Sequence, residues 1–264
     1  MGTANYGRRM VWRGLEAASH VSLLGSIHFF DGPLPGWVLQ VCDTADKVVF
    51  EADTSKARPL PSLPRGKSLK SLSLEVGRRA CAIAERLGGD PADVNRLYPW
   101  AAAIQIGIWA QPEEMQLEHG TDHVLRQQTG AEGKGSLESF EEQYRLLFKE
   151  VPLQEQISGL ADSLDRLDSA PETLRQLLEA WRRGDIEAIW SISKYSELEV
   201  ACPNIVAGTL TKRHELWLPR AVELIEQSAA EGERLLLVPG CLHLTGPYSF
   251  LTYLKSAGYN FQQD

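Results

Sequence analysis

The stretch LLGSIH at Leu23–His28 is matched near the other end of the chain by LVPGCLH at Leu237–His243. Each is an apolar run that ends in Gly-x-x-His, the pattern of a buried strand that stops at a glycine and carries a histidine at its carboxyl end. If the two strands are neighbours in one sheet, both imidazoles can share one ligand. This juxtaposition is our working hypothesis for the fold and the site.

The remaining patterns predict an α/β protein. Lys47–Phe50 forms another short apolar strand, and a weaker strand is expected at Gly133–Glu138. Helical spacing of apolar residues dominates the region between the two ends, at about 66–229. We therefore expect a central sheet built from both chain ends, about 20–55 and 230–264, with a large helical insertion in the middle.

Length and composition bound the protein further. A chain of 264 residues that is 43% hydrophobic can bury one large core, so we expect a single domain over 1–264. The net charge is -8, and neither sign forms a long block, which argues against a nucleic-acid partner or an anionic membrane surface. No export signal is visible, and the four cysteines lack C-x-x-C spacing, so we expect a cytoplasmic location.

Metal-competent side chains follow three of the predicted strands. His28, Glu51 with Asp53, and His243 all fall at carboxyl ends, the edge where open α/β sheets bind ligands. Two neutral imidazoles and a carboxylate suit a divalent transition metal such as zinc, manganese or cobalt. The alternative interpretation is that both histidines are structural and bond to backbone carbonyls.

Two further charged residues are candidates for catalysis. Arg213 is expected near the start of a helix, where it can hold a substrate carboxylate or stabilise an oxyanion; its alternative role is a salt bridge to Glu51 or Glu138. Glu138 can serve as a general base or orient a metal-bound histidine, with surface placement as the alternative. His214 falls on the apolar side of its helix and is expected to be packed.

Short motifs in a fixed order resemble the TraB/GumN family, which includes the Tiki proteins. They span roughly residues 21 to 261 and comprise the two Gly-x-x-His stretches, Ala45–Asp53, Pro99–Ala102, Gly120–Asp122, Gly133–Gln143, Trp181–Asp185, Arg213 and Gly258-Tyr259. The chain departs from the family at His214, where Asn is frequent, at Cys241, where small or aliphatic residues are usual, and at Pro219, which interrupts a helix.

The resemblance implies a metal-dependent hydrolase, most simply peptidase-like, that acts on a peptide or small-molecule substrate. On that analogy His28, Glu51 and His243 are metal or catalytic residues. The wider fold relatives include erythromycin esterases and a haem-binding lipoprotein, so a non-catalytic haem or small-molecule binding protein is the alternative. A catalytically inactive scaffold is the third possibility.

Overall fold

The protein has a mixed β-sheet at its centre. A computed structural model describes residues 8–52, 59–129 and 134–264. Six strands lie in the order β4-β3-β5-β2-β1-β6. The first four in that order run parallel, whereas β1 is antiparallel to both of its neighbours. The strands are β1 (Val11–Gly14), β2 (Val21–Leu24), β3 (Lys47–Ala52), β4 (Lys134–Glu138), β5 (Leu235–Val238) and β6 (Phe261–Gln263).

The two ends of the chain meet in the middle of this sheet. Strand β5 lies between β2 and β3, with Leu237 opposite both Leu23 and Val49. All four residues of β5 are buried, as expected for a parallel strand covered on both faces. The fold is therefore α/β with a sheet built from both chain ends, as the sequence predicts.

Two strands extend the sheet beyond the predicted regions. Strand β1 was not predicted, because Arg13 interrupts its short apolar pattern; the Arg13 side chain instead bonds to Ser22 and Asp264 at the exposed side. Strand β4 confirms the strand expected near Gly133–Glu138 and pairs with β3 from within the helical region. Its parallel register sets Glu138 opposite Ala52, the residue after Glu51.

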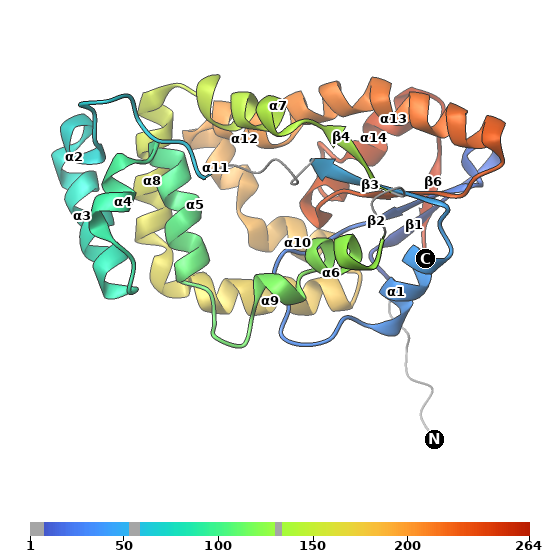
Figure 1. The fold of residues 1–264 in the computed structure, drawn as a ribbon, viewed down its shortest axis with the longest axis horizontal. Coiled ribbons are helices and arrows are strands. Elements are labelled where there is room, and N and C mark those ends of the chain that lie inside the picture. The colour runs from blue at the N-terminus through green and yellow to red at the C-terminus, as the bar shows by residue number, and fades with distance from the viewer. Residues whose placement is uncertain (1–7, 53–58, 130–133) are drawn as a thin grey trace.

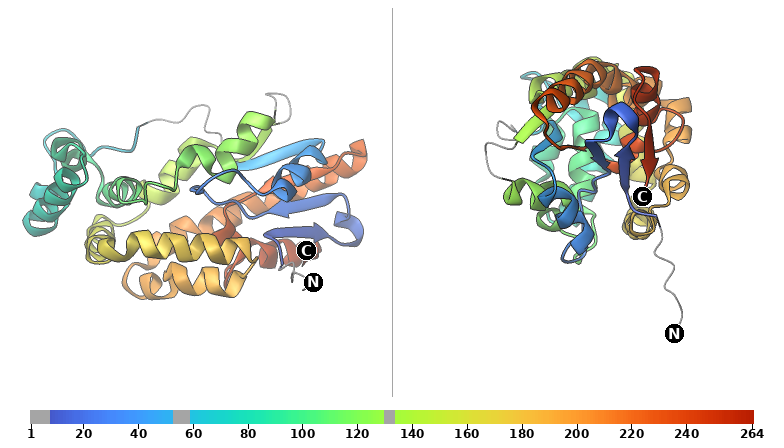
Figure 2. Two further views of the ribbon diagram at one scale, coloured as in Figure 1. Left: turned by 90° about the horizontal axis from the view of Figure 1, so that it is seen from below. Right: turned by 90° about the vertical axis from the view of Figure 1, so that its right-hand side faces the viewer.

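Helices cover both sides of the sheet. The long helix α13 (Thr211–Glu231) lies along one side, and α1 (Gly36–Asp43) and α6 (Thr121–Gln128) lie on the other (Figures 1 and 2). Their apolar residues join one core with the strands, α9 (Ala170–Arg182), α10 (Ile186–Ser193) and α14 (Phe250–Ser256). Helix α13 passes through Pro219 without interruption and ends at Gly232, whose φ of 71° suits a glycine cap.

A second apolar cluster holds the helices at the far end of the molecule, away from the sheet (Figure 1). Helix α5 (Pro99–Trp109) begins at Pro99, a residue suited to the first turn of a helix, and packs against α8 (Leu153–Asp165). Ser73 and Asp185 accept backbone N–H groups at the starts of α3 and α10. The remaining helices are α2 (Leu69–Leu72), α3 (Leu74–Arg86), α4 (Pro91–Arg96), α5 (Pro99–Trp109), α7 (Phe140–Tyr144), α8 (Leu153–Asp165), α11 (Tyr195–Ala201) and α12 (Pro203–Thr209).

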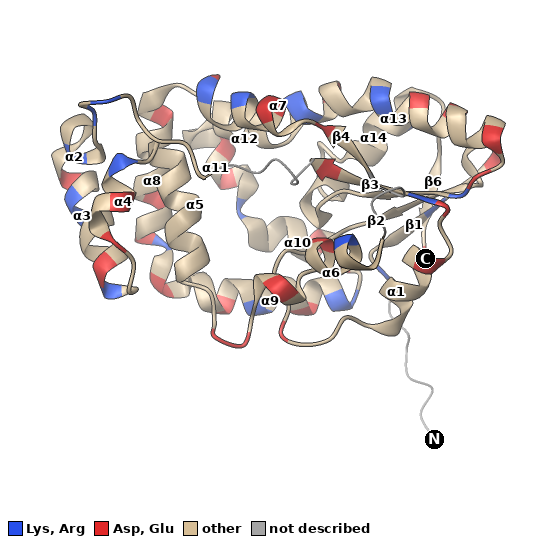
Figure 3. Cartoon of the chain, in the orientation of Figure 1, with Lys and Arg blue, Asp and Glu red and all other residues tan. Residues whose placement is uncertain are grey.

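Charged residues of both signs are interspersed along the helices seen in Figure 3. Among the helices of the described residues, none combines the length and apolar character needed to cross a membrane.

Candidate functional site

The two Gly-x-x-His stretches lie side by side. Beyond the paired strands β2 and β5, Ser26 N–H donates to the Pro239 carbonyl at 2.8 Å, and Cys241 N–H donates to the Ser26 carbonyl at 2.8 Å. A parallel bridge thus joins Ser26 to Gly240. Because β3 and β4 run in the same direction, Glu51 and Glu138 emerge at this same edge of the sheet.

Arg213 is the centre of a buried polar cluster at that edge. Its side chain is only 4% exposed, and its Nη2 pairs with Glu51 Oε2 at 2.7 Å and with Glu138 Oε1 at 2.6 Å. Burial alone would lower the pKa of Arg213, but the two carboxylates raise it further above its usual value. Both carboxylates proposed as salt-bridge partners of Arg213 therefore bind it at once.

Glu51 is the partly accessible carboxylate of the cluster, with 12% of its side chain exposed. Burial by itself would raise its pKa, but the charges of Arg213 and His28 and the Gly240 N–H hold the pKa of Glu51 well below its usual range. Gly240 is required here, because a Cβ at that position would lie 2.8 Å from Glu51 Oε1. Glu51 is therefore ionised at neutral pH.

Glu138 is fully enclosed. It accepts hydrogen bonds from Arg213, from Trp217 Nε1 at 2.9 Å and from Gln143 Nε2 at 3.0 Å. Burial raises the pKa of Glu138 above its usual value, and these donors only partly oppose the change. Glu138 is thus not at the surface, and its carboxylate holds the Arg213 guanidinium through hydrogen bonds.

His243 is buried beside Arg213, on a short 3₁₀ helix, Cys241–Leu244. Arg213 Nη1 lies 3.0 Å from His243 Nε2, and His214 Nε2 lies 2.8 Å from His243 Nδ1. Burial, then the positive charge of Arg213, lowers the pKa of His243 well below its usual value, although Glu51 opposes this. Because Arg213 can only donate, neutral His243 carries its hydrogen on Nδ1 and donates it to His214.

His214 is packed, as predicted, but it also has a polar role. Its ring lies against Trp217, Phe250 and Tyr253. Burial and the Arg213 charge lower the pKa of His214 to about 4, so both histidines of this pair are neutral at pH 7. The pair fixes the tautomer and ring orientation of His243.

His28 stands apart from the buried cluster. Its side chain is 61% exposed, and Nδ1 lies 3.0 Å from Asp122 Oδ2. The Asp122 charge raises the pKa of His28 to about 9, burial opposes this, and Glu51 adds a smaller upward effect. His28 is therefore a solvent-accessible imidazolium at neutral pH.

Asp122 was missed as a site residue by the sequence analysis. It belongs to the first turn of α6, which Thr121 fastens to the first Gly-x-x-His stretch: Thr121 N–H donates to the Ile27 carbonyl at 2.8 Å. A Cβ at Gly120 would lie 2.0 Å from the His28 carbonyl oxygen, so only glycine permits this approach. The motif Gly120–Asp122 was the available signal, but nothing local shows that it faces His28.

The predicted metal set is brought together only in part. His243 Nε2 and Glu51 Oε1 are 3.4 Å apart, close to the separation of about 3.3–3.4 Å between adjacent ligands of a tetrahedral ion with bonds of about 2.0–2.1 Å. However, Arg213 faces the same His243 lone pair. Among the residues that the structure describes, no group of three His, Cys, Asp or Glu side chains is arranged to hold a metal ion. Asp53 lies outside those residues.

The donor arrangement therefore does not fit a bound metal ion while Arg213 keeps this position. A cation already sits against the two candidate ligands, and a second one beside it would be strongly repelled. What the site does offer is an exposed imidazolium, an ionised carboxylate and a neutral, oriented histidine around a fixed positive charge.

Comparisons with known proteins place these motifs in a family. Neither the curated proteins nor the solved structures gave a match to this chain. The model of the TraB/PrgY/gumN family matches residues 10–263, which include every site residue named above, and this confirms the resemblance noted in the sequence. The chain therefore belongs to the TraB/PrgY/gumN family.

Proposed function

We propose that this protein is a hydrolase of amide or ester bonds, with its reaction centre between His28 and Glu51. The observation that supports this most is the His28–Asp122 pair, in which an accessible imidazole has its Nδ1 held by a carboxylate. That arrangement leaves Nε2 free to exchange a proton with a substrate, the task of a general acid or base.

The charges suggest a division of labour. His28, with a pKa raised to about 9 by Asp122, is the group that donates a proton to a leaving group or stabilises a developing oxyanion. Glu51 is ionised and partly accessible, so it can orient the attacking water and take up its proton as the water oxygen bonds to the carbonyl carbon. Both lie at the edge where α/β sheets bind ligands.

The buried residues act through Glu51. Arg213 is almost fully enclosed and gives its N–H groups to Glu51, Glu138 and His243, which supports a positioning role for Arg213 over direct binding of a substrate anion. Glu138 in turn holds Arg213. In this proposal Glu51 contacts the substrate and the attacking water. Arg213 and Glu138 keep the Glu51 carboxylate ionised and in position.

The experiment is hydrolysis of a panel of peptide, amide and ester substrates by the purified protein. We expect His28→Ala and Glu51→Gln to lower kcat/KM by about 10²–10⁴-fold, the usual contribution of a general acid or base. His123→Ala is the matched control, because this histidine on α6 is exposed and its side chain forms a hydrogen bond with Gln127, away from Asp122. Equal activity in His28→Ala and His123→Ala would overturn the proposal.

The metal-dependent form of this hydrolase, with divalent manganese, cobalt or zinc at His28, Glu51 and His243, stays a prediction with its own test. Metal analysis of the native protein and of His28→Ala and His243→Ala measures it directly. Near-stoichiometric metal that both substitutions remove would support it and would require Arg213 to move. A Soret band without hydrolysis of any substrate would instead favour the haem-binding alternative.

A further inference from the structure

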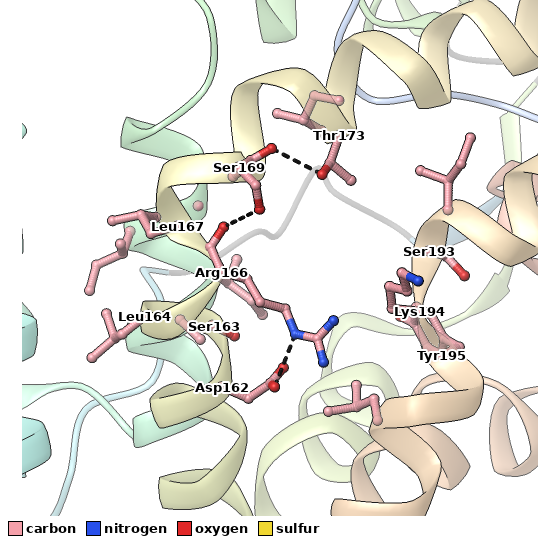
Figure 4. Close-up of a pocket in the computed structure, with 18 of the residues that line it drawn as sticks. Asp162, Ser163, Leu164, Arg166, Leu167, Ser169, Thr173, Ser193, Lys194 and Tyr195 are labelled. Carbon is pink, nitrogen blue, oxygen red and sulfur yellow. Dashed lines mark hydrogen bonds and ion pairs between the residues drawn. The ribbon is translucent and has the colours of Figure 1, made fainter.

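A large cleft lies among the helices next to the site. It has a volume of about 690 Å³, within the range of about 300–1,000 Å³ typical of ligand sites. The walls come from α5, from the turn between α8 and α9, and from the turn between α10 and α11 (Figure 4). Its lining is mainly apolar, and the aliphatic residues include Ile104, Ile108, Leu174 and Ile192.

The cleft adjoins the candidate site in the chain. Phe29, the residue that follows His28, forms part of its lining. Tyr195 also lines it, and burial raises the pKa of the Tyr195 phenol. A molecule in the cleft therefore contacts Phe29, the neighbour of His28 in the chain, and Tyr195.

Four hydroxyl groups of the cleft are already engaged. Ser163, Ser169, Thr173 and Ser193 each donate to a carbonyl of their own helical segment, at 2.7–3.0 Å. Within the bodies of the surrounding helices, as along α5, the backbone groups are likewise paired. Because buried peptide groups without partners are costly, the cleft favours a chain that has no amides to satisfy.

The cations at its rim are also neutralised. Arg166 pairs with Asp162 at 3.0 Å and with Glu197 at 3.1 Å, and Lys194 pairs with the same Glu197 at 3.0 Å. Figure 4 shows Arg166 and Lys194 on opposite sides of the opening. The charges of Arg166 and Lys194 are therefore balanced at the rim, and these residues do not favour an anionic ligand.

From this combination we infer that the cleft binds the hydrocarbon chain of an acyl ester or acyl amide whose carbonyl group lies at His28. The inference rests on the proposed hydrolase function and names its substrate class. Burial of a chain in an apolar cleft strengthens binding by about fourfold for each methylene group removed from water. Preference should therefore rise with chain length until the cleft is full.

Gly107 gives a direct way to fill the cleft. It lies on α5 in the lining, and a Cβ at this position would meet no heavy atom of the described residues within 4 Å. Gly107→Phe should place a ring in the cleft without a clash at its Cβ. Gly107→Ala adds only a methyl group and is the matched control, because it makes the same change in backbone freedom.

Binding is measured first, independently of catalysis. The neutral dye N-phenyl-1-naphthylamine is bound to the protein and displaced by unbranched primary amides of two to twelve carbons. We expect tighter displacement with each added methylene in the native protein and in Gly107→Ala, and at least about tenfold weaker displacement by decanamide in Gly107→Phe. Equal displacement in Gly107→Phe and Gly107→Ala, with both variants folded by circular dichroism, would overturn the inference.

Hydrolysis of p-nitrophenyl esters from acetate to decanoate is the second measurement. The native protein should show a kcat/KM that rises with chain length, and Gly107→Phe should remove the preference for long chains while it spares acetate. Chain-length-dependent binding without any hydrolysis would defeat the proposed function but leave the cleft assignment standing. Hydrolysis that depends on His28 but not on chain length, or that favours hydrophobic peptides over acyl chains, would defeat the acyl assignment alone.

Discussion

Arg213 Nη1 lies 3.0 Å from His243 Nε2, on the side of the ring that carries its lone pair. A guanidinium thus faces the lone pair of a histidine that was predicted to bind a metal ion. The same guanidinium pairs with Glu51 and Glu138, so one permanent cation compensates two buried carboxylates. The stability of this edge of the sheet should depend on it.

Arg213→Ala should therefore lower the free energy of unfolding by about 3–5 kcal/mol, the usual cost of leaving a buried charge without its partner. Urea denaturation at pH 7 measures the change. Lys212→Ala is the control on the same helix, because the Lys212–Glu150 pair is a single contact at 3.1 Å with 37% and 32% of the two side chains exposed, and should cost only about 0.2–1 kcal/mol. Similar losses in the two variants would show that the Arg213 cluster contributes no more than a surface ion pair.

The His28–Asp122 pair makes a prediction about alkaline pH. The pKa of His28 is raised from about 6.5 to about 9 on folding, so the folded protein holds this proton more tightly than the unfolded chain does. The stabilisation is complete below pH 6.5 and is lost as the pH rises through 9. The midpoint of thermal unfolding should fall over this interval in the native protein.

Asp122→Asn removes the charge that raises this pKa. In that variant we expect the His28 resonance to titrate near pH 6.5 by NMR and the alkaline loss of stability to shrink. If the proposed function holds, the pH at which activity falls should shift downward with it. A His28 pKa near 9 in Asp122→Asn would contradict the assignment.

Features set by neighbouring residues in the chain could be predicted from the sequence. Contacts between segments far apart in the chain could not. The Gly-x-x-His stretches and their short apolar runs predicted the paired strands β2 and β5, because alternation and glycine breaks are local signals. Asp122 could not be assigned to His28, since its position depends on the contact between α6 and the loop after β2. Strand β1 was missed because Arg13 breaks its pattern.

The contacts of Arg213 illustrate the same limit. Its candidate partners, Glu51 and Glu138, could be proposed from their places after predicted strands, but their simultaneous pairing with one guanidinium depends on the register of three elements. The exposure of His28 and the burial of His243 also could not be told apart from two nearly identical motifs. Burial is decided by the helices that pack on each motif, and His243 is enclosed by Arg213, His214 and Trp217 of α13.

Gly240 offers a test of how closely Glu51 must approach the backbone. A Cβ there would lie 2.8 Å from Glu51 Oε1, so Gly240→Ala should displace the carboxylate and weaken its pair with Arg213. We expect a loss of about 1–3 kcal/mol in the free energy of unfolding, the range for overpacking a close contact. Gly107→Ala is the matched control, since its Cβ enters open space among the described residues. Equal stability of the two variants would contradict this role.

The neutral pair His214–His243 makes the opposite pH prediction to His28. The pKa of His214 is lowered from about 6.5 to about 4 on folding, chiefly by burial and then by the Arg213 charge, so the unfolded chain binds its proton more readily. Stability should therefore fall as the pH drops from 6.5 to 4, by on the order of 3 kcal/mol from this group, and the lowered pKa of His243 acts in the same direction. Urea denaturation at pH 7 and pH 4.5 measures the loss.

The variant His214→Phe removes the titrating group and can keep the packing of the ring. The loss of stability at acid pH should therefore be smaller in this variant. At pH 7 the variant should be less stable than the native protein, because His243 Nδ1–H has lost its acceptor. An acid loss as large in His214→Phe as in the native protein would mean that other groups control it.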